Sequence, residues 1–193
     1  MASGDKNDPF PFTVAETNAV LRLPNVERMM RRKFVIDSTG YDIPYLAGYS
    51  QDGGTIYIDR DLAKWYFLGT DIDTKRFLLL HEHVEKSLID AIQEDADRKE
   101  VQRLLILLKM TAPDDKIYYH SHGVATACEL YAVKLQHGAA GVKSYNSFMG
   151  TQIKRAEDER IRRVPRNLDM APYGGKDKQD VHLRAVMHAA MEK

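Results

Sequence analysis

The sequence predicts an α+β protein in which a small, mostly antiparallel sheet is followed by a layer of helices. Residues 55–59, Thr-Ile-Tyr-Ile-Asp, follow a Gly-Gly pair and have the β-branched and aromatic composition of a strand. Beyond residue 72, capping residues precede long stretches with helical periodicity. The sheet is therefore expected ahead of the helices in the chain.

The N-terminal region divides into a tail and a broken helix. Residues 1–12 are mostly polar and contain one glycine and two prolines, so we expect a flexible N-terminal tail. Residues 13–33 have an amphipathic helical pattern that Pro24 splits into two pieces. We predict a single domain at residues 13–165 and a C-terminal extension with a short helix at residues 166–193.

Three short segments supply the expected sheet. Residues 34–36 are a β-like run, and residues 41–49 form at best an edge strand because Pro44 interrupts them. Residues 51–54, Gln-Asp-Gly-Gly, favour a hairpin turn because glycine tolerates a positive φ. This turn leads into the strand at residues 55–59.

The second half of the chain is predicted to be helical. Asp73 or Thr74 is the expected N-cap of the first helix, Gly138 ends the third, and Pro165 lies just beyond the fourth. The expected helices cover about residues 73–93, 95–108, 121–137, 143–163 and 180–192.

The composition restricts the classes of partner. The chain has 193 residues, and its 28 Lys and Arg balance 28 Asp and Glu, so the overall charge favours neither nucleic acid nor an acidic membrane. A single cysteine, Cys128, excludes an intrachain disulfide and is typical of a reducing compartment. No apolar run approaches the roughly 20 residues that span a bilayer, and no signal peptide is recognisable. We expect a soluble, cytoplasmic protein without a nucleic-acid or membrane partner; its oligomeric state stays open.

A dense set of metal-capable side chains follows an apolar run in the first long helix. Residues 81–85 are His-Glu-His-Val-Glu. Successive residues turn by about 100° on a helix, so His81 and Glu85 project from nearly one face and Glu82 lies beside them. His83 points elsewhere and is not expected in the same site. The pattern His-Glu-x-x-Glu is close to the metalloprotease motif His-Glu-x-x-His, in which the histidines bind zinc and the glutamate is the general base.

A later helix offers the remaining ligands. His122 and Glu129 are seven residues apart and share one helix face, with small residues such as Ala125 between them. Small residues there allow this helix to approach another closely. Because zinc needs three or four ligands, we predict that His81 and Glu85 bind a divalent ion together with His122, Glu129 or both.

The strand at residues 55–59, a short spacer and residues 76–82 together resemble the core of zincin-like metallopeptidases of the small intracellular type. The resemblance covers about residues 50–130. It implies a zincin-like fold, a zinc ion and a peptide or protein substrate. By the same resemblance His81 is the first ligand, Glu82 the general base and Glu85 the second ligand, with the third ligand from a later helix. Glu85 departs from the pattern, which has a histidine there.

The glutamate at position 85 leaves two functions open. A carboxylate ligand lowers the net positive charge at the metal and makes a bound water a weaker acid, whereas a peptidase needs the opposite. A mixed His and carboxylate set also suits manganese or iron. Our first expectation is a metal-dependent hydrolase, a zinc metallopeptidase with Glu82 as base. The alternative is a non-catalytic, metal-stabilised regulatory or interaction module on a peptidase-like scaffold.

Overall fold

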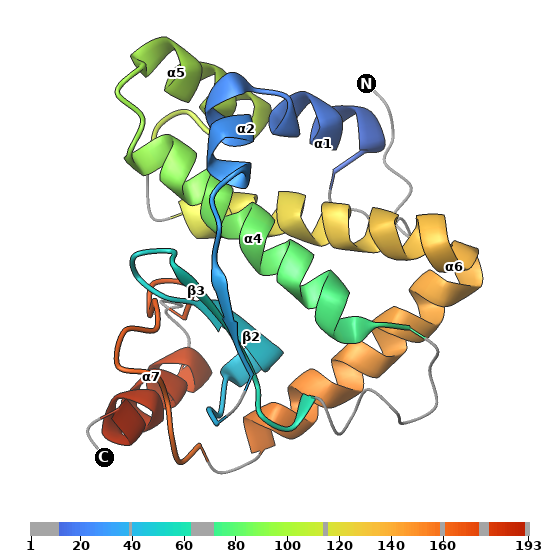
Figure 1. Cartoon of the computed structure of the whole chain (residues 1–193), viewed down its shortest axis with the longest axis vertical. Coiled ribbons are helices and arrows are strands. Elements are labelled where there is room, and N and C mark those ends of the chain that lie inside the picture. Colours follow the sequence, from blue (N-terminus) through green and yellow to red (C-terminus); the bar gives the residue numbers. More distant parts are fainter. Residues whose placement is uncertain are drawn as a thin grey trace.

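The computed structural model describes residues 12–38, 40–62, 72–113, 116–158, 161–173 and 178–191. Figure 1 shows α4 and α6 crossing the middle of the molecule, with the sheet and α7 on one side and α1, α2 and α5 on the other. The α+β class is confirmed. Within the described ranges the elements are α1 (Val14–Leu21), α2 (Pro24–Met30), β1 (Val35–Asp37), the 3-10 helix η1 (Pro44–Leu46), β2 (Ala47–Tyr49), β3 (Thr55–Ile58), α4 (Thr74–Gln93), α5 (Arg98–Leu107), α6 (Ile117–Asp158) and α7 (Lys178–Met191).

The sheet has the strand order β1-β3-β2 and is mixed rather than mostly antiparallel. β1 runs parallel to β3, with Val35 opposite Thr55, while β2 runs antiparallel to β3, with Gly48 opposite Tyr57. The sheet is mixed because the chain reverses direction between β1 and β2, so these two strands run antiparallel to each other. The Gln-Asp-Gly-Gly turn then brings β3 back between the two earlier strands, so β3 is parallel to one and antiparallel to the other.

Several helices begin at capping residues, whereas α6 begins at Ile117, four residues before the start expected at residue 121. Thr13 and Glu16 form a capping box at α1: the Thr13 hydroxyl accepts from the Glu16 N–H, and the Glu16 carboxylate accepts from the Thr13 N–H. Pro24 opens α2, because its missing N–H lies where no intrahelical bond is made. Asp73 caps α4 and Asp97 caps α5 through their side chains.

Gly138 divides α6 into an N-terminal arm (residues 117–137) and a C-terminal arm (residues 139–158). Its φ of 69° and ψ of −171° are non-helical, as the sequence predicts for this glycine. The Tyr145 hydroxyl donates a hydrogen bond to Glu129 across this break. In a straight helix two residues with this separation would lie about 24 Å apart. The arms therefore fold back on each other, and Figure 1 shows the bend where α6 turns from yellow to orange. The C-terminal arm begins and ends earlier than the helix expected at residues 143–163, because the helix resumes directly after Gly138 and α6 ends at Asp158; residues 161–165 are not helical.

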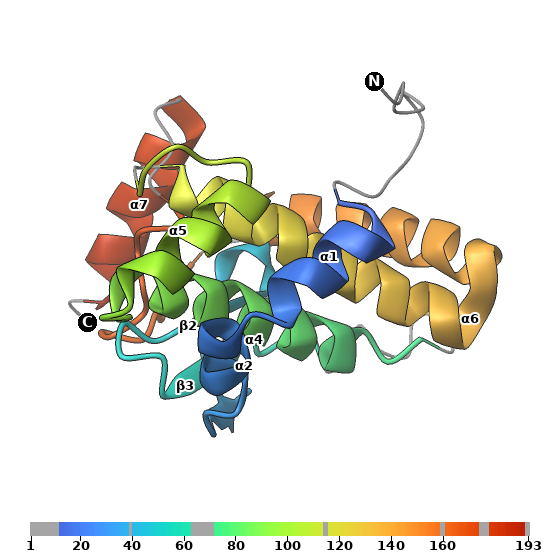
Figure 2. The same cartoon turned by 90° about the horizontal axis from the view of Figure 1, so that it is seen from above.

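Two apolar clusters hold these elements together. The larger one joins the α-helices α1, α2, α4, α5 and α6 to one face of the sheet. Figure 2 shows from above how α1 and α2 lie across α6 and α4. The smaller cluster joins the other face of the sheet to the C-terminal region; its buried members are Ile43, Tyr57, Val164, Leu168, Tyr173, Leu183, Met187 and Ala190.

The ends of the chain bear on the expected domain limits. Phe12, which we assigned to the tail, is buried, and its carbonyl accepts a hydrogen bond from the Tyr131 hydroxyl at 2.8 Å, so Phe12 itself packs on the helices. Residues 1–11 lie outside the described residues. The described part of residues 166–193 packs on the sheet through the smaller cluster. Among the described residues, we find no helix that combines the length and the apolar character needed to cross a bilayer.

Candidate metal centre

The middle of α4 carries three buried polar side chains. His81, Glu82 and Glu85 are only 6%, 9% and 4% exposed. Apolar neighbours on the same helix, such as Phe77 and Leu88, hold α4 against the core and take these groups out of water with them. Buried groups of this kind require partners, and α6 and β2 supply them for His81 and Glu85.

Three potential ligand atoms converge between α4 and the N-terminal arm of α6. His81 Nε2 lies 3.0 Å from His122 Nδ1, His122 Nδ1 lies 2.9 Å from Glu85 Oε2, and His81 Nε2 lies 3.4 Å from Glu85 Oε2. Two ligands of a tetrahedral zinc ion, each about 2.0–2.1 Å from the metal, are separated by roughly 3.3 Å. The three donor atoms therefore fit three corners of such a coordination shell. The His122 side chain is 62% exposed, so the group borders on solvent at this residue.

Glu129 lies behind His81, not among these three atoms. Its Oε2 is 2.9 Å from His81 Nδ1, the ring nitrogen opposite the one that faces His122 and Glu85. Because an ionised carboxylate only accepts hydrogen bonds, Nδ1 carries the proton in this contact. Tyr145 donates to the other oxygen of Glu129. Of the two residues predicted to complete the ligand set, the structure brings His122 into it and makes Glu129 a partner that orients His81.

The sheet orients the carboxylate of Glu85. The hydroxyl of Tyr49, on β2, donates to Glu85 Oε1 at 3.0 Å, which leaves Oε2 directed at the histidines. Sequence reasoning missed both Tyr49 and Tyr145. Their partners are 36 and 16 residues away, so no local spacing indicates them. The available signal was weak: a buried tyrosine hydroxyl usually has a partner, but Tyr49 lies in an apolar segment and Tyr145 among polar residues, so no common pattern marks them.

The electrostatics of the cluster set the charge of each group. Burial disfavours the charged form of His81, but hydrogen bonds to Glu129 and Glu85, together with the negative charges of Glu129 and Glu82, outweigh burial and raise the His81 pKa well above its ordinary value. Burial also opposes ionisation of Glu85, yet hydrogen bonds from His122 and His81 lower the pKa of Glu85 to about 2. Without a metal, the cluster therefore holds an imidazolium among carboxylates.

Glu82 differs from Glu85 although both lie on α4. Burial raises the pKa of Glu82 to about 8; the charge of His81 acts in the opposite direction, and the charges of Glu85 and Glu129 add to the increase. Tyr173, from the segment after α6, is also buried, and burial followed by the charges of Glu82 and Glu85 raises its pKa well above the ordinary value. Glu82 is thus a buried carboxyl group whose pKa lies near neutrality, as a general acid or base requires.

Two other side chains that could bind a metal or act as a nucleophile lie outside the cluster. His83 hydrogen-bonds the Met30 carbonyl at 2.9 Å and packs on the ring of Phe34, so it connects α4 to α2, as its position on the helix predicts. Cys128 is buried, and burial raises the pKa of its thiol to about 12. A thiol with this pKa is protonated at neutral pH and is not a nucleophile.

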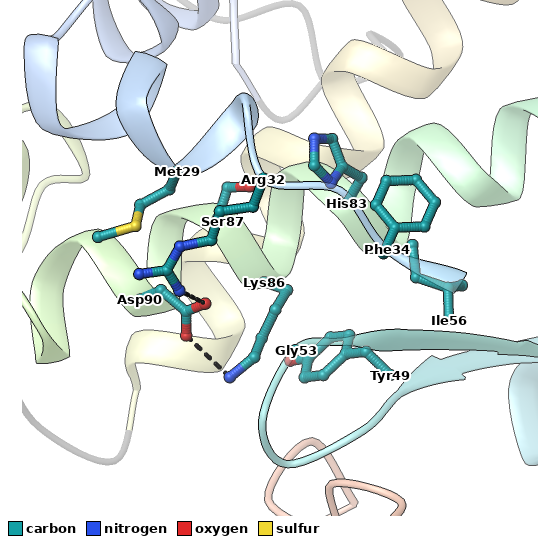
Figure 3. Close-up of a pocket in the computed structure, with 10 residues that line it drawn as sticks. All are labelled: Met29, Arg32, Phe34, Tyr49, Gly53, Ile56, His83, Lys86, Ser87 and Asp90. Atoms are coloured by element: carbon teal, nitrogen blue, oxygen red, sulfur yellow. Dashed lines mark hydrogen bonds and ion pairs between the residues drawn. The ribbon is translucent and has the colours of Figure 1, made fainter. Parts of the chain in front are cut away.

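A small cavity lies on a neighbouring side of α4, and Figure 3 shows its lining. Asp90 accepts there from Arg32 at 3.1 Å and from Lys86 at 2.8 Å, and Tyr49 borders both this cavity and the metal ligands. The cavity volume of about 20 Å³ admits one water molecule. We conclude that this polar network joins α2, α4 and the turn before β3 and is too small for a substrate.

The described residues thus define a candidate metal centre of two histidines and one carboxylate, His81, His122 and Glu85, with the buried Glu82 next to His81 on α4. Comparisons of the chain with protein families, with curated proteins and with solved structures give no match.

Proposed function

We propose that the protein is a divalent-metal-dependent hydrolase that cleaves peptide bonds, with zinc as the first candidate metal. His81, Glu85 and His122 are the ligands and Glu82 is the general base. The observation that carries this proposal is the convergence of the three donor atoms within 2.9–3.4 Å of one another at a buried carboxyl group. The resemblance of residues 50–130 to zincin-like metallopeptidases supports the same assignment.

The ligand set agrees with catalytic zinc chemistry. Two histidines and one glutamate form a known catalytic zinc set, with the fourth position left for water or substrate. Because Glu129 binds His81 and not the metal position, a single carboxylate enters the set, and a divalent ion would keep a net positive charge. The carboxylate of Glu85 therefore weakens the acidity of a metal-bound water less than two carboxylate ligands would. The same set with open positions also suits manganese or iron.

Each protein group has a role in the proposed reaction. A divalent ion, when bound, supplies Lewis-acid polarisation of a water molecule and of the scissile carbonyl. Glu129 keeps the proton of His81 on Nδ1, so that Nε2 presents its lone pair to the cluster. Positive charge at the cluster favours the ionised form of Glu82 and lowers its pKa from about 8. Glu82 then accepts a proton from the attacking water and donates it to the departing amine as the C–N bond breaks.

One observation favours the second candidate function, a non-catalytic metal-stabilised module. The ligands are tied to one another and to Tyr49 and Tyr145 by hydrogen bonds in a largely buried cluster. Such a cluster serves equally to fasten α4 to α6, because metal binding to a folded site adds to the free energy of folding.

Metal analysis tests the shared premise of both functions. Protein purified without added metal is analysed by mass spectrometry of the elements and titrated with Zn²⁺, Mn²⁺ and Fe²⁺. We expect one equivalent of metal and at least a hundredfold loss of affinity in His122→Ala. The matched control is His120→Ala, two residues earlier on the same helix and outside the cluster. If the wild-type protein binds none of the three metals, the metal centre is rejected.

The substitution Glu82→Gln separates the two functions. We expect hydrolysis of an unfolded polypeptide to be lost in this variant while metal affinity is retained, because Glu82 is not among the three ligands. Full activity of the variant would remove Glu82 as the base. A metal-loaded wild-type protein that cleaves no polypeptide would favour the non-catalytic module.

A further inference from the structure

The outer edge of β2 is covered by the chain itself, through residues 161–173, which we call the strap. The Gln51 N–H donates to the Asn167 carbonyl at 2.8 Å, and the Asp169 N–H donates to the Tyr49 carbonyl at 2.8 Å. Ser50 and Leu168 are thereby paired as antiparallel bridge partners. The strap adds a short strand to the sheet without belonging to a hairpin.

The beginning of the strap is fastened to the segment before η1. The Arg162 and Arg163 N–H groups donate to the Asp42 carboxylate at 2.7 Å and 2.9 Å, and the Asp42 N–H donates to the Arg163 carbonyl. In the middle of the strap, Asn167 accepts from the Tyr57 hydroxyl at 2.6 Å. The strap therefore follows β2 and the residues that precede it.

The end of the strap lies against the same strand from another direction. The Tyr173 hydroxyl approaches the Pro44 carbonyl at 3.4 Å, and its ring stacks on Tyr45 with 5.8 Å between centroids. A Cβ atom at Gly48 would lie 3.0 Å from both a Leu168 methyl group and the Tyr173 hydroxyl. Gly48 permits this close approach of the strap to β2.

The covered edge belongs to the strand that also touches the candidate metal centre. Tyr49 accepts a hydrogen bond from the strap through its carbonyl and donates one to Glu85 through its hydroxyl. An extended polypeptide commonly binds a sheet by adding a strand to its edge, where backbone hydrogen bonds supply the affinity. A polypeptide added to β2 would bond the backbone of Tyr49, whose side chain holds the ligand Glu85, and the strap fills that position.

We propose that the strap is an internal occupant of the β2 edge, so that a polypeptide substrate reaches the metal centre only after the strap has left this edge. This inference rests on the proposed function in taking a polypeptide as the substrate. One backbone hydrogen bond joins the strap to Tyr49 of β2 and one joins it to Gln51 just beyond β2, and local opening requires less free energy than global unfolding. The strap is therefore a regulatory element that keeps a polypeptide away from the β2 edge in the free protein.

A reversible disulfide tests the strap within the full chain. Ser50 and Leu168 form a non-hydrogen-bonded pair, in which Cα atoms are about 4.5 Å apart, a distance that a disulfide can bridge. The double variant Ser50→Cys/Leu168→Cys is compared in its oxidised and reduced states, so each sample is its own control. Cys128 is buried and does not compete. The probe is reduced, carboxymethylated lysozyme with a fluorescent label, a permanently unfolded polypeptide, mixed with zinc-loaded protein.

We expect equal zinc affinity in both states and at least tenfold weaker binding of the probe, by fluorescence anisotropy, in the oxidised state. Equal probe binding in the two states overturns the proposal that the strap blocks the β2 edge. The absence of probe binding in both states and in the wild type overturns it as well. Cleavage of the probe is measured in the same samples. A binding difference without cleavage supports the regulatory role of the strap and rejects the hydrolase function. Equal cleavage in both states rejects the regulatory role and supports the hydrolase function.

A second variant loosens the strap without touching its backbone or the ligands. Tyr57→Phe removes the hydrogen bond to Asn167, and the loss of one such bond shifts the opening equilibrium about fivefold. We expect the probe to bind about fivefold more tightly to this variant, and unchanged binding contradicts the proposal. The control is Tyr119→Phe, because Tyr119 is an exposed tyrosine on α6.

Discussion

Glu129 accepts a hydrogen bond from His81 Nδ1 at 2.9 Å, on the side of the ring that faces away from the candidate metal position. This contact fixes which nitrogen of His81 presents a lone pair to His122 and Glu85. Tyr145 holds the second oxygen of Glu129. This relationship predicts that substitutions weaken zinc binding progressively more along the series Tyr145, Glu129 and His81.

Substitution of Glu129 by Gln is expected to weaken zinc binding about 10- to 100-fold, the usual effect of removing a partner that orients a metal-bound histidine. Tyr145→Phe, one step further away, is expected to weaken it less. Zinc affinity is measured by competition with a chromophoric chelator. If Glu129→Gln loses as much zinc affinity as His122→Ala, Glu129 is itself a ligand, which is one of the alternatives predicted from the sequence. Unchanged zinc affinity would show that Glu129 does not orient His81.

Metal binding is expected to release protons and to strengthen as the pH rises. The raised pKa keeps His81 protonated at pH 7, and the Glu82 pKa of about 8 keeps most of that carboxyl group protonated as well. A metal requires the neutral imidazole and favours the glutamate anion, so about one to two protons leave at pH 7. Calorimetric titration in two buffers of different ionisation enthalpy counts these protons.

In Glu82→Gln the proton count should fall towards one, because Gln has no proton to release. An affinity that is independent of pH between 6 and 8 would contradict the assignment of His81 as a ligand.

A larger side chain at Ala125 is expected to separate α4 from α6. Ala125 is fully buried, three residues after His122 and four before Glu129, and therefore on the face of α6 that meets α4. Ala125→Leu should lower the free energy of unfolding by about 1–3 kcal/mol through overpacking, and it should also weaken zinc binding.

The matched control is Ala140→Leu, at an exposed position of α6, which should change neither quantity appreciably. Chemical denaturation and zinc titration of both variants provide the comparison. Stable packing with normal zinc affinity in Ala125→Leu would show that the helices do not need this close approach.

The capping box of α1 should contribute to stability in a pH-dependent way. The Thr13 N–H bond, followed by the interaction with Lys109, lowers the Glu16 pKa from 4.5 to about 2. Because the pKa is lower in the folded state, the contribution is complete above about pH 4.5 and is lost as the pH falls through about 2. At pH 7, Glu16→Gln should cost about 0.5–1 kcal/mol, since the group is exposed and screened by solvent.

Thermal melts of the wild type and of Glu16→Gln between pH 2 and pH 7 test this prediction. The difference in stability should narrow steadily below pH 4.5, and a constant difference would mean that the carboxylate charge is not involved.

The parts of the fold with local causes were predictable from the sequence. Gly138 breaks the long helix because it adopts a positive φ, and Asp73 caps α4 with its own side chain. The pairing of His81 with Glu85 follows from helix geometry alone. In each case the responsible residues lie within one or two helical turns of their effect.

The remaining features depend on contacts between distant segments. The spacing of His122 and Glu129 places both on one face of α6, but which of them meets Nε2 of His81 depends on how α6 crosses α4. Tyr49 and Tyr145 reach their partners only after the sheet and the bend of α6 are in place. The direction of β1 likewise depends on β3, which is formed later in the chain.

The bend at Gly138 has a consequence for the order in which the centre assembles. The contact between Glu129 and Tyr145 closes a loop of 16 residues, whereas the contact between His81 and Glu129 closes one of 48. The shorter loop has the smaller closure entropy, by roughly 1 kcal/mol. We therefore expect the helical hairpin of α6 to form first during folding and to present Glu129 already fixed in place. His81 then docks onto a prepared acceptor, and this later contact fixes the ring nitrogen that His81 presents to the other two ligands.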